Sequence, residues 1–162
     1  MIWRFLLFIA LFTAQLQAAD PEKKTSIFEI RMVYDQPTPN GTELELTRKT
    51  LDRETVTQRL IVARRAILDV TSVKSATVMK DPMTKDPQIM VRFSDSGTKQ
   101  FSKITRENIG RQVAIVIEGK LIMAPRIQEE ISGGSAVIHG DFTPTEAQNI
   151  ADKINQAAKT KD

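Results

Sequence analysis

The chain has 162 residues, of which 41% are hydrophobic and 27% are charged. This composition is typical of one globular domain, alone or with a small extension, and excludes wholesale disorder. Its 23 Lys and Arg residues are interleaved with 20 Asp and Glu residues, so the net charge of +3 excludes the clustered basic face of a nucleic-acid-binding protein. The absence of cysteine excludes disulfides, thiol catalysis and thiolate metal sites, and the fold must be held together by burial alone.

The first 19 residues have the pattern of a signal peptide. Residues 1–4 form a short positive region, residues 5–12 are an unbroken apolar run, and small residues allow cleavage after Ala18 or Ala19. A membrane span needs about 20 apolar residues, so an uncleaved N-terminal anchor is only the alternative interpretation. We expect a periplasmic or otherwise extracytoplasmic protein in which residues 20–26 are a disordered lead-in.

The next segment begins clearly and then loses its pattern. Residues 27–34 alternate well enough to predict a strand, and residues 35–41 contain the prolines, asparagine and glycine of a loop. Residues 42–57 are charged and weakly patterned, which predicts at most one short strand or turn. We therefore interpret residues 27–57 as an N-terminal strand and loop extension, which either completes the sheet or forms a separate flap.

The middle of the chain is ambiguous between strand and helix. In residues 58–68 the apolar residues favour a strand and the Ala and Arg content favours a helix, and we expect a strand as far as residue 63. A capped short helix is expected at residues 71–76. Two strands, at residues 76–80 and 88–93, should then flank a turn formed by two Asp-Pro pairs.

The second half is patterned more strongly. We expect a helix at residues 94–108 with Phe101 and Ile104 facing inward and Gly110 as its left-handed C-terminal cap. Residues 111–118 are apolar on both strand faces, which is typical of a central strand.

A hairpin and a further strand follow. Gly119 and Lys120 predict a tight Gly-X turn, residues 121–124 the returning strand, and Pro125 its end. Residues 135–139 predict another strand.

The last helix has the clearest start signal. Thr143, Pro144 and Glu146 form a capping box with proline at the first helical position. One apolar stripe follows at helical spacing: Ala147, Ile150, Ala151, Ile154 and Ala158. The element order predicts an α+β fold, a mainly antiparallel sheet with two principal helices packed on one face, ferredoxin-like or a related split βαβ sandwich.

The residues that carry chemistry lack the partners that they need. His139 is the sole histidine, and no metal-ligand spacing surrounds it, so we interpret it as a structural or surface residue. Glu129 and Glu130 are adjacent and point apart, which favours a solvated face. Gly133 and Gly134 lack the rest of a phosphate-binding loop. We expect no catalytic residue, cofactor or metal.

The arrangement of motif residues is the most specific signal in the chain. In order they are Gly97, Phe101, Thr105, Asn108, Gly110, Arg111, residues 114–116, Gly119, Lys120, Ala124, Pro125, Ile127, Ile131, Gly133, Gly134, Ala136, Ile138, Gly140, Phe142, Thr143, Glu146 and Ala147. This order resembles the head of the first periplasmic domain of SecD, the accessory subunit of the Sec translocon. The resemblance defines a head-like α+β domain at residues 58–159.

The resemblance implies binding without bond chemistry. It implies contact with unfolded or exported polypeptides, for which Leu121, Met123 and Ile127 are the candidate residues. An exposed sheet edge suits such contact, because its free N–H and C=O groups pair with an extended chain of any sequence. The other motif residues are expected to be mostly structural: Gly110, Arg111, Gly119, Ala124, Pro125, Gly133, Gly134, Gly140, Thr143 and Glu146.

The resemblance also implies what the partners are. They are exported polypeptide and Sec translocon components, with no nucleic acid and no small-molecule substrate. SecD has six membrane-spanning helices that this sequence lacks, so we expect no transduction of ion flow by this chain alone. The alternative is an envelope scaffold with one dedicated protein partner and no export role.

Overall fold

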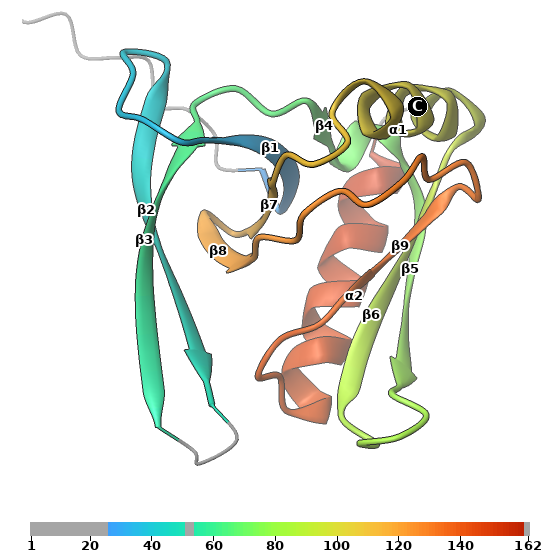
Figure 1. Cartoon of the computed structure of the whole chain (residues 1–162). Helices are drawn as coiled ribbons and strands as arrows, with labels where there is room; N and C mark the ends of the chain where they lie inside the picture. Colours follow the sequence, from blue (N-terminus) through green and yellow to red (C-terminus); the bar gives the residue numbers. More distant parts are fainter. Residues whose placement is uncertain (1–25, 51–53, 161–162) are drawn as a thin grey trace, which may run out of the picture.

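The computed structural model describes residues 26–50 and 54–160, so the predicted signal peptide lies outside the described residues. None of the helices in the described ranges is long and apolar enough to cross a membrane. The elements are shown in Figure 1 and are, in chain order, β1 (Phe28–Tyr34), β2 (Gly41–Lys49), β3 (Thr55–Ala63), β4 (Leu68–Asp69), the 3-10 turn η1 (Val70–Ser72), β5 (Val73–Lys80), β6 (Pro87–Phe93), α1 (Asp95–Glu107), β7 (Val113–Ile117), β8 (Lys120–Met123), β9 (Ser135–Ile138) and α2 (Pro144–Lys159).

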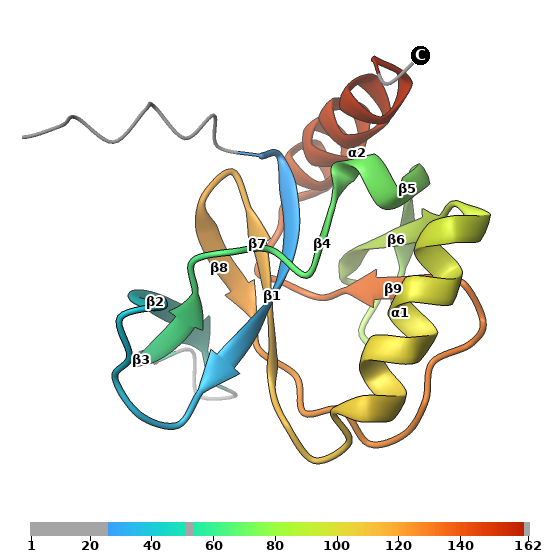
Figure 2. The same cartoon turned by 90° about the horizontal axis from the view of Figure 1, so that it is seen from above.

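Six strands form one sheet that closes on itself. Their order is β3-β2-β8-β7-β1-β4, and β3 also pairs with β1, at Val33↔Val62 and Tyr34↔Ile61. Seen from above in Figure 2, β1, β7, β8, β2 and β3 lie around a common centre. A small apolar core fills it, made of Val33, Leu46, Leu60, Val62, Ala114, Val116 and Leu121.

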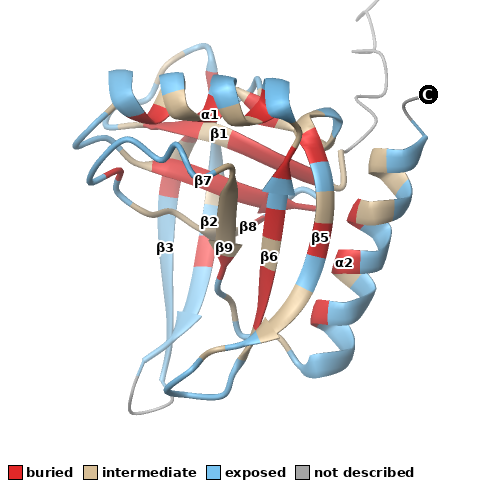
Figure 3. Cartoon of the chain, turned by 90° about the vertical axis from the view of Figure 1, so that its right-hand side faces the viewer, coloured by how far each residue is buried: buried red, intermediate tan, exposed pale blue. Residues whose placement is uncertain are grey.

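The remaining three strands form a second sheet, ordered β5-β6-β9 and antiparallel throughout. The larger core contains side chains from both sheets and both helices, among them Phe28, Ile30, Ile89, Val91, Phe101, Ile115, Ile138 and Ile154. Helix α2 lies beside β5, as Figure 3 shows, and the side chain of Asn155 is hydrogen-bonded to the backbone of Ala76.

The α+β class is confirmed, with the strands in two sheets instead of the single sheet expected. The only parallel pairing among the described strands joins β2 to β8 at Leu46↔Leu121. The sequence allows residues 27–57 either to complete the sheet or to form a separate flap. The structure places β1 inside the closed sheet, where it pairs with β7 along residues 28–32.

Residues 42–57 depart most from the expectation of one short strand or turn. They form nearly all of β2 and the start of β3, which pair over nine residues from Gly41↔Ala63 to Lys49↔Thr55. Figure 1 shows this hairpin as a long ribbon that projects from the body. Its outer half is exposed on both sides, so no apolar alternation marks it as strand.

Three local predictions were wrong in detail. The short helix expected at residues 71–76 is only the turn η1, and Val73 already opens β5. The hairpin turn has Glu118 and Gly119 at its centre, both with positive φ, in place of Gly119 and Lys120. Gly110 does have positive φ, but α1 is capped at Asn108, and the N–H of Gly110 donates instead to the carbonyl of Ile127.

Candidate functional site

An apolar groove lies between β9 and the segment that follows β8. It is open to solvent and has a volume of about 370 Å³; Met123 and residues 125–129 line one wall, and residues 135–139 line the other. Its floor is part of the larger core, and the apolar residues there are at most 5% exposed: Phe28, Phe101, Ile115, Ile127 and Ile138. The more accessible apolar lining comes from Met123, Pro125, Ile131 and Ala136, which are half-buried or exposed. We call this groove the β9 groove.

The wall formed by residues 123–129 is held by backbone hydrogen bonds to the start of β7. The carbonyl of Pro125 accepts from the N–H of Val113 at 3.0 Å, and the N–H of Ile127 donates to the carbonyl of Arg111 at 2.8 Å. The positive φ of Gly110 lets its own N–H reach the carbonyl of Ile127, also at 2.8 Å. The wall is therefore an irregular continuation of the sheet.

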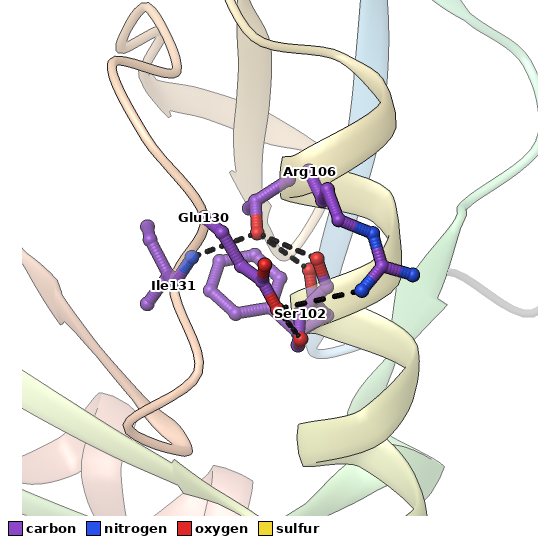
Figure 4. A network of polar contacts seen from close by, with 6 residues as sticks. Ser102, Arg106, Glu130 and Ile131 are labelled. Atoms are coloured by element: carbon purple, nitrogen blue, oxygen red, sulfur yellow. Dashed lines mark hydrogen bonds and ion pairs between the residues drawn. The ribbon is translucent and has the colours of Figure 1, made fainter.

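The far end of this wall is fastened to α1, as Figure 4 shows. Thr105 is only 1% exposed, and its hydroxyl accepts a hydrogen bond from the N–H of Ile131 at 2.9 Å. The same hydroxyl donates to carbonyls one turn earlier in α1. Glu130 accepts from the hydroxyl of Ser102 and lies 3.8 Å from the guanidinium of Arg106. Residues 128–131 thus form a strap that is held to α1 by the buried hydroxyl of Thr105 and, nearer the surface, by the carboxylate of Glu130.

The opposite wall is the edge strand β9, which pairs only with β6 in the described part of the chain. Gly134 precedes it with a φ of +70°, and a Cβ there would lie 2.7 Å from the hydroxyl oxygen of Thr98. Gly133 has open space around it and no positive φ. Of the glycine pair, only Gly134 is required by the local geometry.

His139 lies at the end of the groove and is exposed. The side-chain amide of Gln88 donates to its Nδ1 at 3.0 Å and to Asp81 at 2.5 Å. Hydrogen bonds from the backbone N–H groups of Thr84 and Met83 are the main reason that the pKa of Asp81 is lowered. His139 therefore belongs to a polar chain on the surface, and within residues 26–50 and 54–160 no group of three His, Asp or Glu residues is placed to hold a metal.

A second hollow of about 340 Å³ continues the groove. It shares Met123 and His139 with the β9 groove and runs on to β2 at residues 46–48. At this end the backbone N–H of Lys49 donates to the carboxylate of Asp141 at 3.2 Å, which links the β2–β3 hairpin to the loop after β9. The two hollows form one trough, open to solvent.

The three candidate contact residues do not all lie at the groove. Met123 and Ile127 line the β9 groove, as does Pro125. Leu121 was expected to join them, but its side chain packs into the small core of the closed sheet and lines neither hollow. The register of β7 and β8 shifts between Val116↔Leu121 and Ile115↔Met123, and this bulge turns Leu121 toward the small core although Met123, two residues further on, faces the larger core.

The remaining motif residues occupy turns, caps and close contacts. Arg111 donates to the side chain of Asn108, and Ala124 accepts from Gln112. A Cβ on Gly140 would lie 2.7 Å from the ring of Phe142. Thr143 and Glu146 form the predicted capping box.

Sequence reasoning missed two parts of the groove, the strap anchor Thr105 and the outer edge of β9. The available signal for Thr105 was its position four residues after Phe101, on the inward face of the helix. The position of a strand in its sheet is set by its neighbours and not by its own residues. The sequence of residues 135–138 therefore does not show that β9 is an edge strand.

A family model described as SecDF, P1 head subdomain, matches residues 45–158. The SecD subunit of protein translocase from Sebaldella termitidis is 42% identical over 92 residues, covering 57% of this chain and 22% of that protein. The corresponding subunit from Syntrophobacter fumaroxidans is 30% identical over 139 residues, covering 79% of this chain and 26% of that protein.

A crystal structure of SecDF in its super-membrane-facing form has a similar fold. The TM-score is 0.62 at 27% identity, over 81% of this chain and 19% of that one. The chain spans about a quarter or less of the length of these relatives.

Proposed function

Because the chain belongs to the SecDF P1 head subdomain family, we propose that it binds unfolded polypeptides during protein export and that the β9 groove holds them. The supporting observation is the groove itself, an open apolar trough with backbone on both walls. Apolar lining and backbone groups discriminate little between sequences, which suits a site that meets many different chains. The proposed activity is contact alone, with no bond made or broken.

Titration of the purified chain with several unfolded exported proteins tests this proposal. Each unfolded protein should bind, with dissociation constants that differ by no more than about tenfold, and the same proteins in their folded state should not bind. If none of the unfolded proteins binds, the proposal is wrong.

A pair of methionine variants locates the site. Met123 lines both hollows, whereas Met83 is 91% exposed in the turn between β5 and β6. Met123→Glu puts a charge where apolar side chains should bind and is expected to weaken binding about tenfold or more, because a charge in an apolar contact must be desolvated. Met83→Glu adds the same charge outside the groove and should leave binding unchanged. Equal effects of the two variants would place the site elsewhere.

Location and partners are part of the same proposal. The relatives are subunits of protein translocase, so we propose that this chain is exported and works beside translocon components. N-terminal sequencing of the mature protein should give a start after Ala18 or Ala19. Crosslinking in cells should give many nascent chains and translocon components. A single discrete partner would instead support the envelope scaffold.

A further inference from the structure

The two edges of the three-stranded sheet differ in what lies beside them. At the β5 edge, α2 lies alongside and Asn155 takes up both backbone polar groups of Ala76. At the β9 edge, neither Ser135 nor Val137 makes a backbone hydrogen bond outside the sheet within the described ranges. An uncovered edge is a template for another strand.

The pairing of β9 with β6 fixes which backbone groups are free. The N–H of Phe93 donates to the carbonyl of Gly134, and the register then runs in order to Ile89↔Ile138. In an antiparallel ladder, residues alternate between hydrogen-bonded and non-hydrogen-bonded pairs. Ala136 and Ile138 therefore point their N–H and C=O groups at β6, and Ser135 and Val137 point theirs outward.

The outward side is the side on which the groove lies. Residues 135–139 line it, with the strap and residues 123–129 opposite. The side chain of Ile138 is buried in the larger core together with Phe28 and Phe101, which also line the groove. A strand laid along β9 would turn every second side chain toward these residues and the others toward solvent.

We propose that the β9 groove takes its polypeptide as an added β-strand, paired through the backbone of Ser135 and Val137. The segment that it selects is extended, with apolar residues at alternate positions. This inference rests on the proposed function and specifies both the mode of binding and the class of segment. A long chain fits the site better than a small molecule does, because the second hollow continues the groove as far as β2.

A peptide of about eight residues with valine at every second position and polar residues between them is a suitable probe. Three versions are compared: unmodified, N-methylated at residues whose N–H groups face β9, and N-methylated at the residues whose N–H groups face away. Either alternate set of peptide residues can face β9, so each set is methylated in a separate peptide. Methylation of one set should weaken binding about tenfold or more, and methylation of the other set should leave binding unchanged.

The outcomes separate the two proposals. If the unmodified peptide and the unfolded proteins both fail to bind, the proposed function fails. If the peptide binds and both methylated sets bind equally well, or both equally badly, strand addition is wrong while polypeptide binding stands.

A backbone variant tests the same point on the protein. Val137→Pro removes an outward N–H and leaves the bonds of β9 to β6 in place, which proline permits on an edge strand. It should weaken binding of the unmodified peptide about tenfold, whereas Val137→Thr, which keeps the N–H, should bind as the parent chain does. Normal binding by a folded Val137→Pro protein would overturn the proposal. If Val137→Pro does not fold, the methylated peptides decide alone.

A second copy of the chain is the competing occupant of this edge. Sedimentation of the protein without peptide should show a monomer at micromolar concentration. Self-association that Val137→Pro abolishes would assign the edge to pairing between copies and contradict the proposal.

Discussion

Asn155 in α2 and Ala76 in β5 are joined by two hydrogen bonds. The backbone N–H of Ala76 donates to Oδ1 of Asn155 at 2.7 Å, and Nδ2 of Asn155 donates to the carbonyl of Ala76 at 2.8 Å. One side chain thus meets both polar groups of an edge residue, as a neighbouring strand would. At Ala76 the helix therefore takes the place of a neighbouring strand, whereas Ser135 and Val137 of β9 have no backbone partner on their outward side among the described residues.

Replacing Asn155 with leucine should destabilise the protein. Asn155→Leu keeps the size of the side chain and leaves the N–H and C=O of the buried Ala76 unpaired, so the free energy of unfolding should fall by about 1–3 kcal/mol. Urea denaturation measures it. Gln156→Leu, at the exposed next position of α2, is the control and should change the free energy by less than about 0.5 kcal/mol. Equal stability of the two variants would contradict this role of Asn155.

Thr105 should control the strap of residues 128–131. Thr105→Val removes the acceptor of the Ile131 N–H at a fully buried position, and should cost about 1–3 kcal/mol. Amide hydrogen exchange at Ile131 should accelerate. Thr105→Ser keeps the hydroxyl, and Ile131 should then remain protected. Slow exchange at Ile131 in Thr105→Val would show that the strap is held by other contacts.

The sequence pattern predicted the elements of the second half well, where turn and cap residues are frequent, and those of the first half poorly. The capping box at Thr143 and the wholly buried strand β7 were both predicted, because their signals are local. β2 was missed because its outer half is a two-stranded ribbon with solvent on both sides, which needs no apolar alternation. The start of β5 was predicted at residue 76 instead of Val73, because a register shift between Val73 and Ser75 breaks the alternation of its side chains.

For the candidate site, the contact of Leu121, Met123 and Ile127 with polypeptide stays a prediction, and the structure shows only where each side chain lies. Met123 and Ile127 were named from the motif, and they do line the groove. Leu121 and Met123 are two residues apart, so strand alternation predicts the same face for both. The bulge in the pairing of β8 with β7 places them on opposite faces. The open edge at β9 depends on which strands neighbour it, and this long-range pairing is decided by the fold as a whole.

Gly134 and Gly133 should respond in opposite ways to the same change. Gly134→Ala forces alanine into a positive φ and against Thr98, so we expect a loss of about 1–3 kcal/mol in the free energy of unfolding. Gly133→Ala meets open space without positive φ and should be neutral or slightly stabilising. Thermal denaturation of both variants is sufficient. A larger loss of stability in Gly133→Ala than in Gly134→Ala would contradict the positive φ of Gly134 and its close approach to Thr98.

The capping box should be visible in the titration of Glu146. The backbone N–H and then the hydroxyl of Thr143 donate to its carboxylate, and these bonds lower the pKa of Glu146. Because the folded-state pKa is the lower one, this stabilisation is present above the unfolded-state pKa and is lost as the pH falls through the folded-state pKa.

Thr143→Ala should raise the pKa of Glu146 part of the way back, since the backbone N–H at position 143 remains. Loss of the cap should also cost about 1 kcal/mol at neutral pH. Carboxyl NMR titration measures the pKa, and Thr145→Ala, on the exposed first turn of α2, is the control. An unchanged pKa in Thr143→Ala would mean that the hydroxyl does not contribute.

Amide chemical shifts of the folded chain, recorded while an unfolded exported protein is added, locate the bound polypeptide directly. The shifts should move at residues 135–139 of the β9 wall and at residues 123–131 opposite, and the amides of Ser135 and Val137 should become protected from exchange. Shifts confined to the exposed face of α2 or to the β2–β3 hairpin, with Ser135 and Val137 unprotected, would contradict binding in the β9 groove.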